Sequence, residues 1–414
     1  MKFIENVDKD KYIEFTDNHP KSHFLQSYAW GEFCRKIKGQ IPYYVGMIDD
    51  DNNLVATALI LLKKTPLGYS YGYSPRGFLI DYNNQELIKK FSDYLKEFMI
   101  DKKIIYIKFD PDIPYQDIDE DANPIPNGNN NYDLYNFMLS LGYIHTGFYK
   151  LYEGNQPRYT FRINLKRDWS EIESKMSKSF LKSVKRSDLY DLEIDNDIKI
   201  DDFYRLIQSN SSKDDFDAHN LKYYQVFTEE LKKEGTVKYF NVSIKPKELV
   251  EKFTKEIEEV KKELETNKKR AEDLKNRLIK LEKDLNVFKD IKEDKVVVCS
   301  LICTYTKNRA WSMFIGSDDL ANMTFAVTKA YYEAIKDAFN EGYDFFDLFG
   351  TPGDPHTNYK NLAKLHDFKR KFGDQYIEFI GEFDLVNKKV LYRILPILLG
   401  VYRKVRKIFQ KSGQ

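Results

Sequence analysis

Residues 248–290 carry apolar side chains in a heptad pattern, and most of the positions between them are Lys, Glu, Asp or Arg. Read from Phe253, the spacing alternates between four and three residues, which is typical of a coiled-coil seam. Asn267 is the polar residue that interrupts the series. The apolar positions are Phe253, Ile257, Val260, Leu264, Ala271, Leu274, Leu278, Leu281, Leu285 and Phe288.

The flanking segments predict how this helical stretch is folded. Residues 237–244 and 296–305 both have the pattern of β-strands, so the helical stretch interrupts a sheet. A single straight helix would separate those strands by about 60 Å. A hairpin of two antiparallel helices, turning near Thr266 and Asn267, returns the chain to its starting point. We therefore predict a coiled-coil helical arm over residues 246–293, with a linker or a dimerisation zipper as the alternative.

The size and charge of the chain limit its class. With 414 residues the chain exceeds the size at which a single core usually stops growing, so we expect two or more domains. The 66 basic and 65 acidic residues give a net charge of +1. Any nucleic-acid surface must therefore come from local segregation of charge.

The cysteines, the histidines and the apolar runs exclude further classes. Cys34, Cys299 and Cys303 lack metal-ligand spacing, and the chain has only six histidines, so we expect neither a metal nor a cofactor. This cysteine usage is typical of a reduced, cytosolic protein. The N-terminus has no apolar signal core, and no apolar run is long enough to span a membrane. The sequence thus predicts a soluble, cytoplasmic protein.

Strand and helix patterns alternate twice along the chain. We expect a mixed α/β (α+β) fold with one lobe over residues 1–149 and a second over 150–245 and 294–390, interrupted by the arm. Residues 391–414 read as a basic amphipathic helix. Two interpretations of that helix are open, namely contact with an anionic membrane surface and packing of its apolar face on the first lobe.

Basic side chains also gather on a predicted helix over residues 169–185. The spacing of three, four and three residues places four lysines on one face of such a helix, with an arginine adjacent. A face of this kind can follow the phosphates of a tRNA, or it can simply be solvated. The residues are Lys175, Lys178, Lys182, Lys185 and Arg186.

Five short motifs carry a family resemblance. They are QSYAW at 26–30, GYSPRGFLID at 72–81, IYIKFDPDIP at 105–114, YDFFDLFG at 343–350 and DFKRKFGDQYIEFIGEFDLV at 367–386. In this order they resemble the Fem family (FemABX-type) of aminoacyltransferases, which use aminoacyl-tRNA to extend the stem peptide of peptidoglycan precursors. The resemblance covers nearly the whole chain, and the heptad arm lies where tRNA-using members carry a helical arm.

The resemblance implies a fold, a reaction and two substrates. The fold would be two acetyltransferase-like (GNAT) lobes with the precursor bound in the cleft between them. The reaction would transfer an amino acid from aminoacyl-tRNA to the side-chain amine of the stem peptide, building an interpeptide bridge. The acceptor would be lipid II or the soluble UDP-MurNAc-pentapeptide. The protein would act in the cytoplasm, and contact of its basic C-terminal helix with the membrane would place it at the inner face of the membrane.

The motifs also imply site residues. Lys369 and Asp110 match catalytic positions, as an oxyanion or carboxylate partner and as a candidate base. Arg76, Tyr224 and Phe368 match substrate-binding positions.

The chain departs from the family pattern at two positions. Cys34 replaces a frequent lysine, and Asn220 replaces a phosphate-binding arginine. We therefore expect the neighbouring Arg35, Lys36 and His219 to contact the precursor instead.

Two rival functions are weighed against this one. An acyl-CoA acetyltransferase of the same fold should carry a Gly-rich pyrophosphate loop, and the sequence has none. P-loop, dinucleotide-binding and nucleophile-elbow signatures are absent as well. A non-enzymatic scaffold, whose coiled coil binds a partner, is the other alternative.

Overall fold

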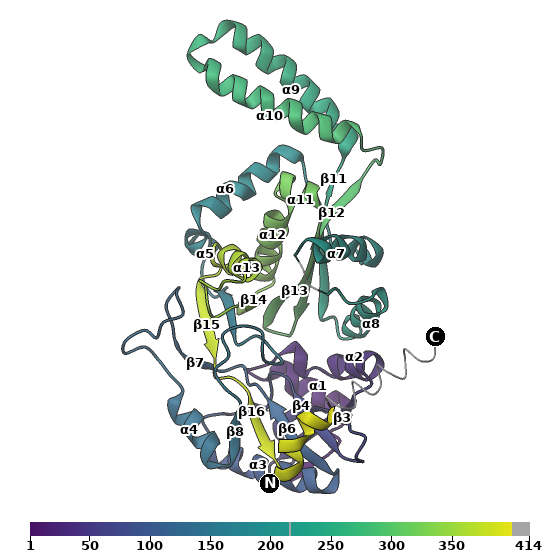
Figure 1. Ribbon diagram of the computed structural model, residues 1–414, viewed down its shortest axis with the longest axis vertical. Coiled ribbons are helices and arrows are strands. Elements are labelled where there is room, and N and C mark those ends of the chain that lie inside the picture. Colours follow the sequence, from purple (N-terminus) through teal and green to yellow (C-terminus); the bar gives the residue numbers. More distant parts are fainter. Residues whose placement is uncertain (215–216, 400–414) are drawn as a thin grey trace.

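The computed structural model describes residues 1–214 and 217–399, which form two eight-stranded mixed sheets (Figure 1). The two sheets and their helices form two lobes, and a helical arm projects from the second lobe at the end of the molecule far from the N-terminus. The predicted two-lobed α/β fold with an inserted helical hairpin is confirmed.

The first sheet has the strand order β1-β2-β3-β4-β6-β16-β8, with β5 pairing beside it on β3. The strands β4 and β6 run parallel, and α3 makes the crossover between them. Leu87, Phe91, Leu95 and Phe98 recur at helical spacing on α3 and are buried against the sheet. The strands are β1 (Lys2–Ile4), β2 (Ile41–Ile48), β3 (Leu54–Lys64), β4 (Ser70–Ser74), β5 (Leu79–Ile80), β6 (Ile104–Phe109), β8 (Tyr143–His145) and β16 (Phe383–Val386), and the helices are α1 (Lys9–Asn18), α2 (Tyr28–Lys38), α3 (Gln85–Asp101) and α4 (Tyr132–Ser140).

The second sheet has the order β10-β11-β12-β13-β14-β9-β15-β7. Its strands are β7 (Pro114–Asp117), β9 (Tyr159–Asn164), β10 (Glu193–Asp195), β11 (Val237–Ile244), β12 (Val296–Tyr305), β13 (Arg309–Ser317), β14 (Phe345–Thr351) and β15 (Gln375–Phe379). Its helices are α5 (Trp169–Lys175), α6 (Lys178–Ser187), α7 (Ile200–Asp214), α8 (Leu221–Lys232), α11 (Asp319–Thr324), α12 (Ala326–Asn340) and α13 (Lys360–Arg370).

Each sheet includes one strand from the part of the sequence that builds the other lobe. The strand β7 comes from the first 149 residues but pairs with β15 in the second sheet. The strand β16, near the end of the described chain, lies between β6 and β8 in the first sheet. A cut of the sequence at residue 149 therefore does not separate the two sheets.

A shared apolar core joins the two lobes. Trp30 and Phe33 of α2 pack against Phe227 of α8, with ring centroids 6.4 and 5.6 Å apart. The side chain of Lys36 on α2 also pairs with the buried Glu230 of α8 at 2.6 Å. Apolar packing and an ion pair thus hold α2 of the first lobe against α8 of the second.

The arm has the predicted form. The helix α9 (Pro246–Thr266) ends at Asn267, a short 3-10 turn follows at Lys268–Arg270, and α10 (Ala271–Lys289) runs back. Seam residues including Phe253, Val260, Leu274 and Leu285 are buried between the two helices. The strands on either side pair with each other, Ile244 opposite Val296, so the hairpin returns the chain to the sheet.

The predicted single helix over residues 169–185 is wrong. The helix α5 ends at Lys175, Met176 is extended (φ −71°, ψ 141°), and α6 begins at Lys178. Ser177 causes the restart, because its side chain accepts the backbone N–H of Phe180 as an N-cap. The five basic residues therefore lie on two helices.

The C-terminal helix is described only in part. Residues 389–399 are helical, and the Tyr392 hydroxyl donates to Asp384 Oδ2 of β16 at 2.7 Å. The rest of the predicted helix, residues 400–414, lies outside the described chain. Within residues 1–214 and 217–399, we find no helix with both the length and the apolar content that crossing a membrane requires.

Candidate functional site

Lys369 lies in the last turn of α13 with its amine buried under the end of β14. Its Nζ donates to the backbone carbonyls of Phe349 at 3.1 Å and Gly350 at 2.7 Å. At Phe349 the backbone is left-handed (φ 58°), and the pairing of β14 with β9 shifts register there. Burial lowers the pKa of the Lys369 amine to about 7, although the carboxylate of Asp347 opposes the shift. The amine can therefore change its charge near neutral pH.

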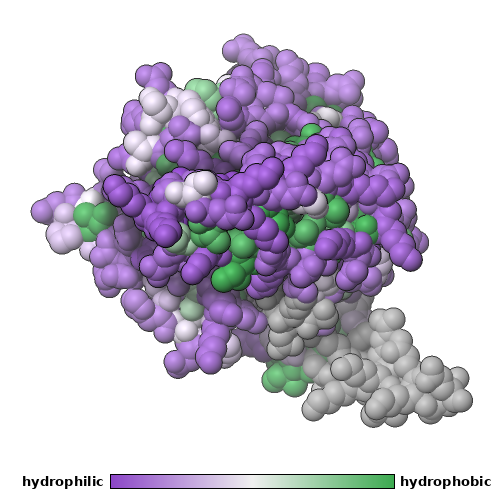
Figure 2. Space-filling model, turned by 90° about the horizontal axis from the view of Figure 1, so that it is seen from above, coloured by the Kyte–Doolittle hydropathy of each residue, from purple (hydrophilic) through white to green (hydrophobic). Residues whose placement is uncertain are grey.

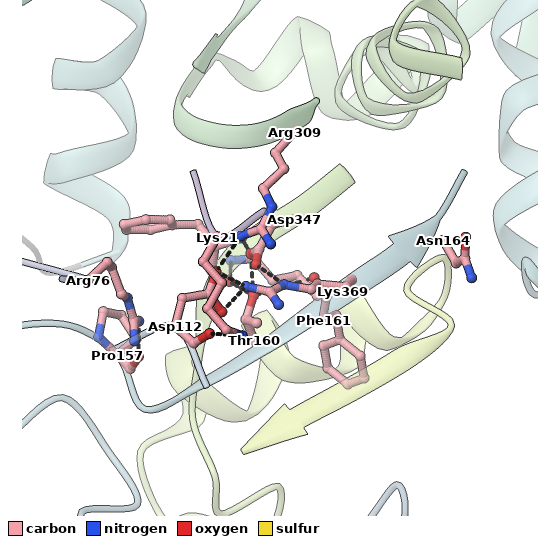
Figure 3. A network of polar contacts seen from close by, with 12 residues as sticks. Lys21, Arg76, Asp112, Pro157, Thr160, Phe161, Asn164, Arg309, Asp347 and Lys369 are labelled. Atoms are coloured by element: carbon pink, nitrogen blue, oxygen red, sulfur yellow. Dashed lines mark hydrogen bonds and ion pairs between the residues drawn. The ribbon is translucent and has the colours of Figure 1, made fainter. Parts of the chain in front are cut away.

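A buried ionic network connects this end of β14 to the first lobe (Figure 3). Arg162 of β9 bonds Asp347 through Nε at 2.7 Å and grips both oxygens of Asp112 through Nη2 at 2.7 and 2.8 Å. Arg309 of β13 reaches Asp112 at 3.1 Å. Burial alone would raise the pKa of the Asp112 carboxyl, but the two guanidinium groups outweigh it and hold that pKa well below its usual range. The Asp112 carboxyl therefore stays ionised at neutral pH.

Asp110 is a buried carboxyl at the end of β6. It accepts the backbone N–H of Arg76 at 2.8 Å and the hydroxyl of Tyr73 at 3.0 Å. Burial raises the pKa of Asp110 to about 7; Arg76 opposes the rise, and the Glu382 carboxylate adds to it. Asp110 and Asp112 are two residues apart, yet only Asp110 can exchange a proton near neutral pH.

The loop that delivers Arg76 to Asp110 depends on a glycine. Arg76 has a positive φ of 51°, and a Cβ on the following Gly77 would lie 2.4 Å from Ser74 Oγ and 2.7 Å from Gln26 Nε2. A side chain at Gly77 would therefore push this loop away from the strand end, because both neighbours are buried.

Phe379 of β15 lies between the Asp110 side and the ionic network. The guanidinium of Arg76 lies 4.1 Å from the centre of its ring, and that of Arg162 lies 5.2 Å from it. Figure 3 shows Arg76 and Lys369 on opposite sides of this network. Asp110, which is bonded to the backbone of Arg76, and Lys369 are two buried groups whose pKa values lie at about 7.

A separate open pocket lies at the junction of α2 and α8. It is lined by Lys36, His219, Asn220 and Lys222, among others. The His219 ring stacks on Tyr223 with centroids 3.7 Å apart, and burial lowers its pKa. The predicted residues Lys36 and His219 therefore line the same pocket, and Lys222 is the second lysine in it.

Comparison with known proteins identifies the family of this fold. The family model described as "FemAB family" matches residues 7–398, which is nearly the whole chain. The chain belongs to the FemAB family. The resemblance to the Fem family found in the sequence is thus confirmed, and with it the expectation of an enzyme of the transferase class.

Named relatives of this FemAB protein share about a quarter of its residues. The lipid II:glycine glycyltransferase of Staphylococcus epidermidis is 24% identical, over 94% of this chain and 94% of its own length. The protein of that name from Staphylococcus aureus is 24% identical, over 95% of this chain and 94% of its own length. The crystal structure of FemX has the same fold, with a TM-score of 0.76 at 22% identity over 95% of this chain and 99% of FemX.

Two predicted substrate contacts of this FemAB protein, Tyr224 and Phe368, pack against other aromatic side chains. Tyr224 is 2% exposed and packs edge-on against Phe203 and Phe314, and its hydroxyl accepts the backbone N–H of His219 at 3.3 Å. Phe368 packs against Tyr331 of α12 and neighbouring core residues. Both aromatic side chains contribute to packing, and direct substrate contact at either position stays a prediction.

Arg35 lies apart from the pocket that Lys36 and His219 line. Its guanidinium bonds the carboxylate of Glu32 at 2.7 Å on the exposed face of α2.

The predicted basic residues of α5 and α6 are all exposed, and the side chain of Arg186 lies 5.9 Å from the centre of the Phe325 ring.

Sequence reasoning missed the ionic network. Its acidic members, Asp112 and Asp347, lie inside the quoted motifs IYIKFDPDIP and YDFFDLFG, but neither was singled out. The available signal was Arg162, the charged residue in the middle of the otherwise uncharged strand β9. A buried charge in a strand requires a buried partner, and the partner here comes from the other lobe.

Proposed function

We propose that this FemAB protein transfers an amino acid from aminoacyl-tRNA to the side-chain amine in the stem peptide of lipid II, extending an interpeptide bridge. The names of the relatives, which match over almost their full length, support lipid II as the acceptor and glycine as the first amino acid to test. The observation that carries the chemistry is the pair of buried groups, Asp110 and Lys369, whose pKa values both lie at about 7.

The reaction is the aminolysis of an ester. The acceptor nitrogen attacks the aminoacyl carbonyl, a C–N bond forms, and the bond from that carbonyl to the 3′ oxygen of the tRNA breaks. An alkyl amine with an ordinary pKa of about 10.4 is protonated at pH 7, so one proton must leave it before attack. Asp110 suits this role, because a base with a pKa near the working pH is both available and strong enough. The vicinal hydroxyl of the tRNA ribose is the alternative proton carrier.

Lys369 suits the stabilisation of the negative charge that develops on the aminoacyl carbonyl oxygen. An ammonium has three N–H donors, and two of them bond the carbonyls of Phe349 and Gly350. The third can donate to the oxyanion that develops on the aminoacyl carbonyl, or to a substrate carboxylate. Its two backbone bonds fix the position of the donor in advance, which is what makes such stabilisation effective.

The arm and the adjacent basic helices support tRNA as the donor carrier. Lys268, Lys269 and Arg270 are all exposed at the tip of the arm. The helix α6 lies near the base of the arm, where Tyr190, just after α6, packs against Phe253. Seen from above the arm, the molecular surface is predominantly hydrophilic (Figure 2). The proposed tRNA surface therefore runs from the tip of the arm to the basic residues Lys175, Lys178, Lys182, Lys185 and Arg186.

The pocket between α2 and α8 supports a phosphate-bearing acceptor. Lys36, Lys222 and His219 bring donors to one opening at the junction of the lobes, and Arg35 adds an exposed cation on the same helix as Lys36. We assign this pocket to the diphosphate of the precursor, in place of the lysine and arginine that the family usually carries.

The C-terminal helix supports a position at the membrane. Along residues 388–399, Val390 is 74% exposed and Ile397 is 69% exposed, while Lys388, Lys389 and Arg393 add positive charge. Apolar side chains beside basic ones suit the surface of an anionic bilayer. We therefore place the protein in the cytoplasm, at the inner face of the membrane, where lipid II is within reach.

A matrix of donors and acceptors tests the proposal. The purified protein is incubated with glycyl-tRNA, a pool of other charged tRNAs or acetyl-CoA, each with lipid II or UDP-MurNAc-pentapeptide, and the products are weighed by mass spectrometry. We expect lipid II to gain one amino acid from charged tRNA. Transfer from acetyl-CoA alone would exclude aminoacyl-tRNA as the donor. Transfer to UDP-MurNAc-pentapeptide alone would exclude lipid II as the acceptor.

A further inference from the structure

A small cavity of about 10 Å³ lies beside Asp110, and Glu382 and Arg158 also line it. This volume is about what one water molecule needs, and it is too small for any larger ligand. Part of the lining comes from residues 147–157, a strap without helix or strand. The strap is tied down, because Arg76 Nη2 donates to the Pro157 carbonyl at 2.6 Å and a backbone N–H of the strap donates to Glu382.

Arg158 brings two unpaired donors to this cavity. Its side chain is 5% exposed, and its Nη1 donates to Glu378 at 2.8 Å and to the Tyr159 hydroxyl at 3.0 Å. Nε and Nη2 are buried and have no hydrogen-bond partner among residues 1–214 and 217–399. Nε lies 3.7 Å from where a Cβ on Gly381, which also lines the cavity, would stand. Because a buried donor without a partner is costly, these two donors call for an acceptor that fits the cavity.

The two carboxyls of the lining each have an acceptor position to spare, since a carboxylate offers about four lone-pair sites. Asp110 accepts the backbone N–H of Arg76 on Oδ1 at 2.8 Å, and the Tyr73 hydroxyl on Oδ2 at 3.0 Å. Glu382 is engaged by three donors, namely the Lys108 amine at 2.9 Å, a backbone N–H of the strap and a threonine hydroxyl. Both carboxyls can therefore accept one further hydrogen bond.

We propose that the cavity holds one water molecule, which accepts from Nε and Nη2 of Arg158, donates to Asp110 and Glu382, and carries a proton between these two carboxyls. Water has two donor and two acceptor positions, so this arrangement satisfies all four of them. It also gives a partner to each of the two buried donors of Arg158.

The role of this water in the reaction rests on the proposed function, in which Asp110 takes a proton from the acceptor amine. The new O–H bond of Asp110 then breaks while an O–H bond forms to the water, and an O–H bond of the water breaks while one forms to Glu382. Asp110 is ionised again, the water is unchanged, and Glu382 releases the proton to solvent beside the exposed Asn155 of the strap. Glu382 and Arg158 act on the substrate only through Asp110, so both are positioning residues.

The charge of Glu382 gives this arrangement a measurable sign. Burial raises the pKa of Asp110 most, Arg76 opposes the rise, and the like charge of Glu382 adds to it. Removal of the Glu382 charge should therefore lower the pKa of Asp110. The charged and titratable groups that face Asp110 are Tyr73 and Arg76 from β4 and the loop after it, Lys108 from β6, and Arg158 and Glu382 at the cavity.

Two measurements on the full-length protein test the site without any substrate. A high-resolution crystal structure of the wild type should show one ordered water within hydrogen-bonding distance of Nε and Nη2 of Arg158. An NMR titration of aspartate labelled with ¹³C at the side-chain carboxyl follows Asp110, which is assigned by the loss of its signal in Asp110→Asn. Glu382→Gln should move this titration to lower pH.

Asp384→Asn is the matched control. Asp384 is also buried and pairs with the same Lys108 amine at 3.0 Å, but it lies outside the cavity lining. It should leave the Asp110 titration where it is. A wild-type cavity without the water, or an Asp110 titration that Glu382→Gln does not move, overturns the proposal. If Glu382→Gln does not fold, the wild-type crystal structure decides alone.

Transfer kinetics separate this result from that of the proposed function. Glu382→Gln should lower kcat at pH 8 at least about tenfold, because Asp110 loses the acceptor for its proton, and Asp384→Asn should not. If the water is present and the titration moves but no charged tRNA supports transfer, the water site stands and the proposed reaction falls. If transfer occurs and Glu382→Gln retains full kcat, the reaction stands and the proton route falls.

Discussion

The backbone N–H of Arg76 donates to Asp110 Oδ1 at 2.8 Å, and this bond holds a titratable carboxyl in a buried site at the junction of two lobes. The same carboxyl is kept from the surface by the loop that carries Arg76, while Asp112, two residues on, is paired with Arg162 and Arg309. One short strand end therefore supplies a proton acceptor and a structural anion side by side.

Replacing Asp110 by Asn should separate stability from activity. The raised pKa means that folded Asp110 binds its proton more tightly than unfolded Asp110, so its ionisation destabilises the fold as pH rises from about 4 to 7. Asp110→Asn removes this cost and should raise the free energy of unfolding by up to about 4 kcal/mol at pH 8. At pH 4 the same variant should show no gain. Denaturant unfolding at both pH values measures the difference, and an equal effect at the two would contradict the assigned pKa.

The same substitution should slow transfer. A positioned general base typically contributes about 100- to 10,000-fold, so Asp110→Asn should lower kcat by at least about 100-fold. Lys89→Gln, which breaks an exposed ion pair with Asp93 on α3, serves as a control for general damage to the protein. If Asp110→Asn retains full kcat, the ribose hydroxyl rather than Asp110 carries the proton.

The pH dependence of transfer should be a narrow bell. Activity should rise through pH 7 as Asp110 loses its proton, and should fall above pH 7 as Lys369 loses its charge. Rates measured from pH 5.5 to 8.5 under saturating substrate check this shape. Asp110→Asn should lose the acid limb, and a rate that climbs steadily to pH 8.5 would exclude a role for charged Lys369.

Arg162 should contribute more to the free energy of unfolding than an exposed arginine such as Arg35 does. Arg162→Met leaves the buried carboxylates of Asp112 and Asp347 without their shared partner, and breaking a buried pair typically costs about 3–5 kcal/mol. Arg35→Met breaks an exposed pair and should cost at most about 1 kcal/mol. Equal losses in the two variants, measured by denaturant unfolding, would show that the network does not hold the lobes together.

Shortening the arm should affect the tRNA substrate alone. Residues 260–274 can be replaced by a short Gly-Ser loop, which keeps Phe253 and the bond from Tyr190 to Asp284 at 2.8 Å at the base of the arm. We expect the KM for aminoacyl-tRNA to rise at least about tenfold, because phosphate contacts supply much of such affinity. The KM for the acceptor should not change. Replacing Lys268, Lys269 and Arg270 by Ala should also flatten the salt dependence, and unchanged tRNA kinetics in both variants would favour a partner-binding arm.

The sequence predicted the features that depend on local pattern. The heptads of the arm and the turn at Asn267 were readable because helix pairing follows from residue spacing. Asp110 and Lys369 were found through motifs, although their depth in the protein was not readable. The break at Ser177 was not predicted. A serine inside a helical pattern is only a weak signal that a new helix begins there, and tertiary packing decides whether it does.

The long-range features could not be predicted in this way. Arg162 meets Asp112 and Asp347 across 50 and 185 residues, and no local rule specifies which carboxylates a buried arginine will find. Tyr224 shows the converse problem, since a tyrosine can face a ligand or fill a core with the same sequence context. The exchange of β7 and β16 between the sheets likewise depends on strand pairing far apart in the chain.

The central claim, that buried Lys369 stabilises the transition state of transfer from aminoacyl-tRNA, is tested most directly by the rate of Lys369→Ala. Both substrates are held saturating and product is counted by mass in a single turnover, with circular dichroism confirming that the variant is folded. Removing one oxyanion donor typically costs about 100- to 1,000-fold, and here we predict that transfer becomes undetectable against the wild type. Full transfer activity in the folded variant would contradict the account.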